Sequence, residues 1–140
     1  YPDLYKAGIA IAAVAHFRAV LKHERDRWNR ASYVYWHALL NREDFDTIEP
    51  HIDPLVRAAE LKQPIYIMHG ERDDIVHPTE AKRMVEALKQ TNPHVESKSF
   101  LNASHSYWPY EARVVQLNEI GSFLRRYLSA QDVASAAGGP

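Results

Sequence analysis

The chain of 140 residues contains no cysteine. That absence excludes a disulfide framework, a thiolate metal site and a cysteine nucleophile, and it leaves the cellular compartment open. Long hydrophobic runs are also missing. The apolar stretch at residues 8–14 is far shorter than the roughly 20 residues that a membrane-spanning helix needs. We therefore expect a folded domain that does not span a membrane, with its localisation unknown.

An excess of one charge is lacking too. The sequence has 17 lysines and arginines against 18 acidic residues, for a formal net charge of -1. No run of basic residues favours nucleic acid or an anionic membrane surface, so neither is expected as a partner. The chain begins with Tyr1 rather than methionine, and we expect it to be part of something longer.

The most informative stretch is residues 64–78, PIYIMHGERDDIVHP. Residues 65–68 are continuously apolar, which is typical of a central strand buried on both faces of a parallel sheet. A His-Gly pair ends that strand, and Asp73 and Asp74 follow in the loop. Open α/β sheets place ligand and catalytic groups beyond the carboxyl ends of their strands. Pro78 then begins a helix, where its missing N–H is harmless.

Other segments alternate in type along the chain. We expect a strand at 8–14, helical structure within 15–46 and from 28 to 40, a proline-broken connection at 49–63 with a short helix at 55–61, a helix at 78–90, a strand at 94–100 and a helix at 109–128. This order predicts an α/β fold with a mostly parallel sheet flanked by helices. Residues 130–140 have too little apolar content to fold and are predicted to be disordered.

Three segments carry a family resemblance. The segment HGERDDIVHP resembles the acid-bearing loop of the prolyl oligopeptidase family of serine peptidases, YPDLYKAGIAIAAVAHF resembles the segment after the serine-bearing helix, and NASHS lies where the family has its histidine. The resemblance covers most of residues 1–128 and implies the α/β-hydrolase fold. Residues 1–129 would then be the C-terminal part of a hydrolase catalytic domain.

The resemblance also implies two catalytic residues. In α/β-hydrolases the triad follows the chain order serine, acid, histidine. Asp73, the first acid of the Asp-Asp pair, matches the acid, and His105 matches the histidine at a separation of 105 − 73 = 32 residues. His105 would act as general base and Asp73 would orient it. Each has a plainer interpretation, because an acid after a strand is often a turn former and a loop histidine is often only surface. Asp74 is expected to be such a turn former.

The sequence departs from the family at several positions. Ser106 follows the histidine where relatives commonly have glycine, and Ile75 stands where they often have a polar residue that binds substrate. Ile75 would therefore line the substrate site without hydrogen-bonding a peptide carbonyl. Phe17 falls near an aromatic substrate-contacting position of the family, and core packing is its alternative role.

The nucleophile motif is absent. No G-x-S-x-G occurs in the chain, and the resemblance places this serine elbow, with the oxyanion hole, upstream of Tyr1. The isolated chain is therefore predicted to be inactive. The other seven of the eight histidines form no HExxH motif or comparable ligand pattern, so we expect no metal site and no cofactor.

Three functions remain open at this stage. The first is a serine peptidase that cleaves peptide bonds through an acyl-enzyme, and the second is a carboxylesterase-type hydrolase of the same fold, with a small ester as substrate. The third is a non-catalytic module that retains the fold alone. If the strand at 8–14 lies at an edge of the sheet, its unpaired backbone groups also predict self-association.

Overall fold

The computed structural model describes residues 4–26, 30–40 and 44–128. Their elements follow in the order β1 (Gly8–Ile11), α1 (Phe17–Asp26), α2 (Arg30–Leu40), α3 (Phe45–Ile52), a 3₁₀ turn η1 (Ala58–Glu60), β2 (Ile65–Gly70), α4 (Thr79–Lys89), β3 (Val95–Phe100) and α5 (Tyr110–Tyr127). The tail predicted at 130–140 lies outside the described residues, and so does Trp28, the first residue of the helix expected at 28–40. No helix within the described ranges is both long enough and apolar enough to cross a bilayer.

The three strands form one parallel sheet in the order β1-β2-β3. The register pairs Gly8 with Ile65 and Ile65 with Val95, so all three strands run in step toward the same edge. β2 is the central strand and is buried from its second residue onward, as its apolar run predicts. The sequence prediction of a parallel α/β sheet flanked by helices is confirmed.

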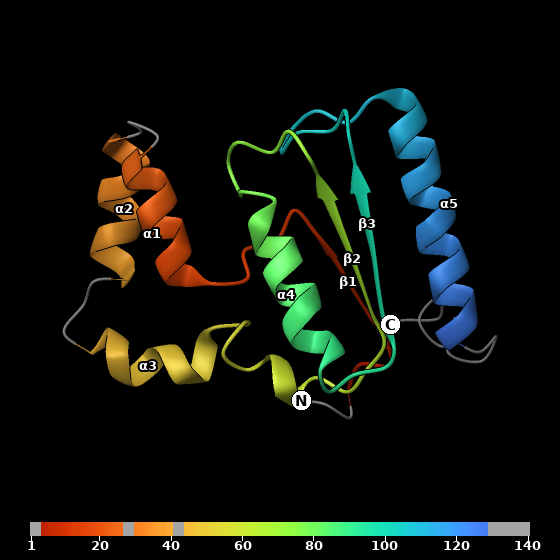
Figure 1. The fold of residues 1–140 in the computed structure, drawn as a ribbon, viewed down its shortest axis with the longest axis horizontal. Coiled ribbons are helices and arrows are strands. Elements are labelled where there is room, and N and C mark those ends of the chain that lie inside the picture. Colours follow the sequence, from red (N-terminus) through yellow and green to blue (C-terminus); the bar gives the residue numbers. More distant parts are fainter. Residues whose placement is uncertain (1–3, 27–29, 41–43, 129–140) are drawn as a thin grey trace, which may run out of the picture.

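Successive residues of β2 pack on opposite faces of the sheet. Tyr66 and Met68 join a core cluster with Phe123 of α5, whereas Ile67 joins a second cluster with Leu88 of α4. Figure 1 shows α4 and α5 on opposite sides of the strands. One central strand thus anchors two separate apolar layers.

Tyr66 also makes a polar contact with α5. Its hydroxyl donates to the Glu119 carboxylate across 3.2 Å. Burial, reinforced by the nearby negative charge of Glu119, raises the pKa of Tyr66 to about 12. Lys98 donates to the other oxygen of Glu119 at 2.6 Å, and this bond lowers the pKa of that carboxyl.

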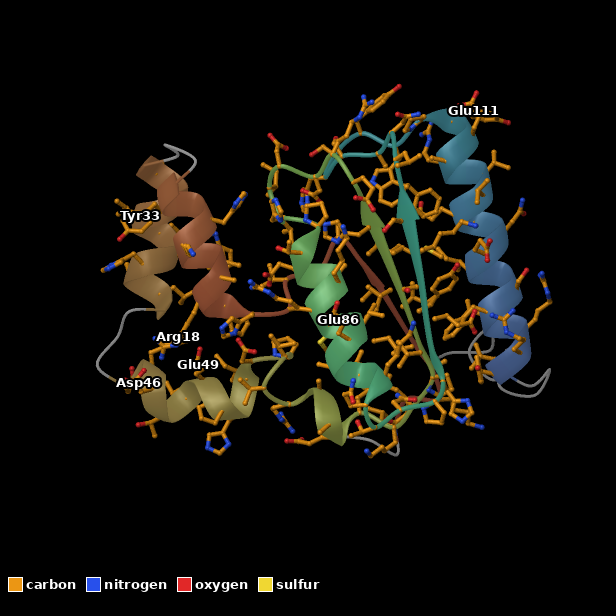
Figure 2. The ribbon with its side chains drawn as sticks, viewed as in Figure 1. Arg18, Tyr33, Asp46, Glu49, Glu86 and Glu111 are labelled. Carbon is orange, nitrogen blue, oxygen red and sulfur yellow. The ribbon has the colours of Figure 1, made fainter. Side chains whose placement is uncertain are left out.

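The helices α1, α2 and α3 lie together beside α4, away from the sheet (Figure 1). Arg18 of α1 reaches Glu49 and Asp46 of α3, as Figure 2 shows, and its Nε donates to Glu49 across 2.8 Å. We call residues 15–57 the helical arm, and residues 8–11 together with 62–128 the sheet region.

Three expectations about the elements are wrong. The first strand ends at Ile11 rather than at residue 14, because Ala12 adopts a left-handed conformation with φ of 50° that turns the chain off the sheet. The segment expected to be broken by prolines instead contains α3, with Pro50 inside it. Pro50 removes one backbone donor, which this short helix tolerates. The short helix expected at 55–61 is reduced to η1.

The last helix forms nearly as expected. Of the large apolar side chains along it, Leu117 is 66% exposed, whereas Phe123 is fully buried. Gly121 lies inside this helix, where glycine is unfavourable. A Cβ there would meet only the flexible end of Arg125, at 3.4 Å, so the glycine is not required by packing.

Candidate active site

Asp73 and His105 meet at the edge of the sheet where β2 and β3 end. Asp73 lies in the loop after β2, and His105 lies in the loop after β3. Because these strands are adjacent and parallel, their following loops leave side by side. The Nδ1 atom of His105 lies 3.0 Å from Oδ2 of Asp73, within hydrogen-bond distance. The sequence prediction paired these two residues, and the structure brings them together.

The Asp73 carboxylate is buried and held by its own loop. Its side chain has 0% exposure, whereas that of His105 is 35% exposed. Oδ1 accepts the backbone N–H groups of Ile75 at 2.9 Å and Val76 at 2.8 Å. Asp73 therefore itself has the turn-forming role that the sequence suggested for Asp74, while its other oxygen remains directed to the histidine.

The two loops fit together because Gly70 has no side chain. A Cβ at Gly70 would lie 2.4 Å from the carbonyl oxygen of Ala103, closer than any real contact. The same carbonyl accepts the N–H of Arg72 at 3.0 Å, which fastens the acid loop to the histidine loop. The glycine at the last position of β2 is thus needed for the approach of His105 to Asp73.

This geometry can support proton transfer. With a hydrogen on Nδ1 donated to Asp73, the opposite nitrogen of His105 has a free lone pair. Among the described residues, none is hydrogen-bonded to that Nε2 atom, and the ring is partly open to solvent. A substrate or a nucleophile from outside these residues could therefore reach Nε2.

Of the two expected substrate-contacting residues, one lies next to Asp73. Ile75 is exposed and lines a hollow of about 290 Å³ between the acid loop and α1, together with Val20 and His23. Phe17, at the first residue of α1, does not line that hollow, and its backbone N–H is bound to Asp53. The structure does not bring the two together in one cavity.

Sequence reasoning missed the histidines that join α1 to the acid loop. Nε2 of His23 lies 3.0 Å from the carbonyl oxygen of Asp74, and the ring of His23 packs edge-on against that of His77 at 5.6 Å. Because 51 residues separate His23 from Asp74, no local pattern could have shown this contact.

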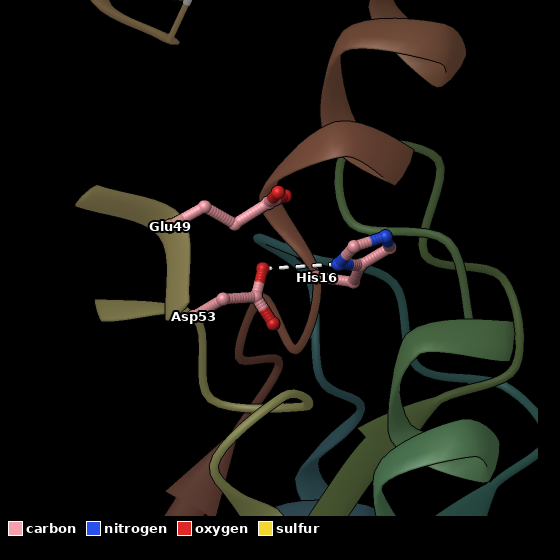
Figure 3. Close-up of side chains that lie close together, drawn as sticks. All are labelled: His16, Glu49 and Asp53. Atoms are coloured by element: carbon pink, nitrogen blue, oxygen red, sulfur yellow. Dashed lines mark hydrogen bonds and ion pairs between the residues drawn. The ribbon is translucent and has the colours of Figure 1, made fainter. Parts of the chain in front are cut away.

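His16, Glu49 and Asp53 form a second cluster of titratable side chains, shown in Figure 3. Their ligand atoms lie within 4.8 Å of one another, and one imidazole with two carboxylates is a donor set that divalent transition metals accept. Oδ2 of Asp53, however, already accepts from His16 Nδ1 and from the N–H of Phe17, each at 2.9 Å.

The remaining oxygen of Asp53 is also used. Oδ1 accepts the N–H groups of Leu55 at 3.0 Å and Val56 at 3.1 Å. The carboxylate is therefore satisfied by protein donors alone, and the cluster joins the start of α1 to the end of α3. Sequence spacing gave no signal of this cluster because its histidine lies far from both acids in the chain.

Comparisons with known proteins identify the family of the chain. Residues 1–131 match the sequence profile of the prolyl oligopeptidase family. Among curated proteins, the chain is 32% identical over 102 residues to an uncharacterized peptidase, YuxL, of Bacillus subtilis (strain 168), covering 69% of this chain and 15% of that protein.

Two solved structures share the fold. A puromycin-hydrolyzing peptidase of Mycobacterium tuberculosis superposes with a TM-score of 0.79 at 20% identity, over 91% of this chain and 19% of the other. An esterase of Pyrococcus furiosus superposes with a TM-score of 0.66 at 22% identity, over 89% of this chain and 46% of the other. At these identities the likeness shows the α/β-hydrolase fold, and the chain spans less than half the length of these three proteins.

Proposed function

The chain belongs to the prolyl oligopeptidase family of serine hydrolases, and from that premise we propose that Asp73 and His105 are the acid and the base of a catalytic triad. The supporting observation is the 3.0 Å contact between Nδ1 of His105 and Oδ2 of the buried Asp73, at the carboxyl end of the sheet. That edge is where α/β enzymes position catalytic groups.

In this mechanism His105 moves the proton and Asp73 holds His105. Nε2 of His105 takes the hydroxyl proton of a serine as that oxygen attacks the substrate carbonyl, and an acyl-enzyme forms when His105 returns the proton to the leaving group. Water, activated by the same Nε2, then releases the acid product. Asp73 fixes the Nδ1–H tautomer and stabilises the imidazolium formed at each step.

The serine comes from outside this sequence in our proposal. The chain has no G-x-S-x-G motif, and it covers 15% of its curated relative. We propose that residues 1–129 are the C-terminal part of the catalytic domain, and that the elbow and the oxyanion hole belong to the remainder of a longer parent. The chain alone is then inactive. Within the assembled site, Ile75 would contact the substrate and Phe17 would belong to the pocket wall.

A fluorophosphonate probe, which labels activated serines, tests this function. We expect the longer parent protein to take up one probe group and the 140-residue chain to take up none, as read by intact mass. In the parent, His105→Ala should slow labelling at least about 10³-fold, because the serine loses its base. His94→Ala, at an exposed histidine remote from Asp73, is the matched control and should label normally. Normal labelling in His105→Ala would refute the assignment.

The peptidase and esterase alternatives differ in the bond cleaved. The curated relative is named as a peptidase, which favours peptide substrates, whereas the fold likeness to the Pyrococcus furiosus protein keeps a small ester in view. Parallel assays of the parent with an aminoacyl amide and the matching ester distinguish them. Amide turnover far below that of the ester would favour the esterase. A parent sequence without a serine elbow would favour the non-catalytic module.

The edge of the sheet supports a further proposal, self-association. Within the described residues β1 pairs with β2 alone, so its outer side presents unpaired N–H and C=O groups. We propose that two copies of the isolated chain pair through β1. Light scattering over a wide concentration range should show a dimer that Ile9→Pro abolishes, whereas a wild-type monomer at every concentration would count against it.

A further inference from the structure

One buried histidine takes no part in the proposed proton transfer. His69, near the end of β2, is 3% exposed. Its Nε2 lies 2.8 Å from the carbonyl oxygen of Val76 and 3.3 Å from Oδ2 of Asp73, on the same oxygen that contacts His105. Its Nδ1 is buried and has no hydrogen-bond partner among the described residues.

These contacts determine where the imidazole carries its hydrogen. Both neighbours of Nε2 are acceptors, so Nε2 must be the donor. A hydrogen on Nδ1 instead would leave that N–H buried without an acceptor and would set a lone pair against the Val76 carbonyl. His69 therefore directs an N–H toward Val76 and, at longer range, toward the carboxylate of Asp73.

The result is a closed set of bonds around the acid. The N–H of Val76 binds Oδ1 of Asp73, and the C=O of the same residue accepts from His69. Val76 of the acid loop is thus bonded both to His69 of the central strand and to the Asp73 carboxylate. An apolar side chain could fill the space of His69, but it would leave the Val76 carbonyl unpaired and would remove the N–H that lies 3.3 Å from Oδ2.

We propose that His69 is a positioning residue, whose Nε2–H orients the Asp73 carboxylate so that Oδ2 faces Nδ1 of His105. The proposal rests on the proposed function, because the orientation of Oδ2 matters for catalysis only if Asp73 and His105 belong to a catalytic triad. His69 does not touch the reacting atoms and acts only through Asp73. Its effect should therefore appear in the state of the His105 ring and not only in stability.

Two substitutions, His69→Gln and His69→Asn, test whether the position of the N–H donor matters or only the presence of a polar side chain. Glutamine places its amide nitrogen near the location of Nε2, whereas asparagine reaches only to that of Nδ1. Long-range ¹H–¹⁵N correlation spectra of the 140-residue chain, at a pH where imidazoles are neutral, report which nitrogen of His105 carries the hydrogen. His105→Ala assigns the signals, and His94→Gln is the control for loss of a remote histidine.

We expect the wild type, His69→Gln and His94→Gln to show the Nδ1–H form of His105. In His69→Asn, and in His69→Met as a second variant without the donor, the Nε2–H form should become the major one while the amide spectrum remains folded. An Nδ1–H form that persists in both would overturn the positioning role and leave the Asp73–His105 pair intact.

Two other outcomes would also overturn it. An Nε2–H form in the wild type would remove the basis of the proposed function and of this inference together. Unfolding of both variants without the donor, with His69→Gln folded, would show that His69 serves the fold rather than the carboxylate.

Discussion

Different interactions stabilise the sheet region and the helical arm. In the sheet region, three parallel strands carry two apolar clusters, one under α4 and one under α5. In the arm, Phe45 is buried yet belongs to neither cluster, and exposed apolar side chains remain on α2, namely Val34, Tyr35 and Leu39. Burial stabilises the first region, whereas the second relies far more on polar contacts.

Those polar contacts are concentrated where the arm meets α4 and the acid loop. The buried carboxylate of Glu80 in α4 accepts the backbone N–H groups of Ala15 at 3.3 Å and His16 at 2.8 Å. His23 adds the contact to the acid loop, and Asp53 links the two ends of the arm. A few directional bonds thus position helices whose described residues join neither apolar cluster, and we expect the arm to open at a lower free energy than the sheet.

Truncating one buried phenylalanine in each region should give the largest difference in the free energy of unfolding. Phe123→Ala removes a fully buried ring that packs on Tyr66 and Tyr127, and we expect a loss of about 3–5 kcal/mol in the free energy of unfolding. Phe45→Ala should cost about 2 kcal/mol, since its ring lies outside both clusters. Urea unfolding followed by circular dichroism measures both. Equal costs would mean that the arm and the sheet form one cooperative unit.

Asp53→Ala tests the polar connection of the arm. The change leaves the N–H groups of Phe17, Leu55 and Val56 without their acceptor, and we expect a loss of about 2–4 kcal/mol. Hydrogen exchange should accelerate in α1 and α3 before it does in β2. Asp46→Ala, whose side chain is 87% exposed, is the control and should change stability by less than about 0.5 kcal/mol. Uniform acceleration across the whole chain would contradict a separately opening arm.

High pH should weaken the sheet region through Tyr66. The hydroxyl is held neutral in the folded chain, where its pKa is about 12, whereas the unfolded residue ionises near pH 10. Its contribution is therefore fully present below about pH 10, is lost progressively as the pH rises to about 12, and amounts to about 2–3 kcal/mol.

Tyr66→Phe isolates this effect from other titrations. The variant keeps the ring in the α5 cluster and lacks the ionising group. Urea unfolding at neutral pH and near pH 12 should show a steeper loss in wild type than in the variant. Parallel pH profiles for the two proteins would show that Tyr66 titrates alike in the folded and unfolded chains.

Two glycine substitutions should have the smallest effects on stability, and these effects should be of opposite sign. Gly70→Ala forces a Cβ against the carbonyl of Ala103, and we expect a loss of about 1–3 kcal/mol with shifted resonances of His105. Gly121→Ala meets only the end of Arg125 and should stabilise α5 by up to about 1 kcal/mol. Thermal unfolding measures both, and a tolerated alanine at Gly70 would show that the two loops can separate without cost.

The sequence predicted best where one local signal was strong. The strand β2 and the helix α4 were predicted correctly, because burial on two faces and burial on one stripe leave different patterns in a sequence. Boundaries failed where a single backbone angle decided them, as at Ala12, and the exposure of Leu117 depended on where α5 rests on the sheet. At the candidate site, Asp73 and His105 were predicted from the resemblance of their loops to those of the prolyl oligopeptidase family, whose order and spacing they match.

What the sequence determined by itself is the α/β architecture, the parallel order of its elements and the pairing of one acid with one histidine. The first two follow from local periodicity. The pairing follows from the resemblance of the two loops to those of the prolyl oligopeptidase family, and it agrees with the rule that loops leave parallel strands at the same edge. Only the tertiary structure showed that Asp53 joins the ends of the arm, that Gly70 admits the histidine loop, and that His69 lies against the acid. These contacts join distant segments or depend on how a loop folds back. Periodic patterns in a sequence report only local structure, so they do not show which distant residues lie close together.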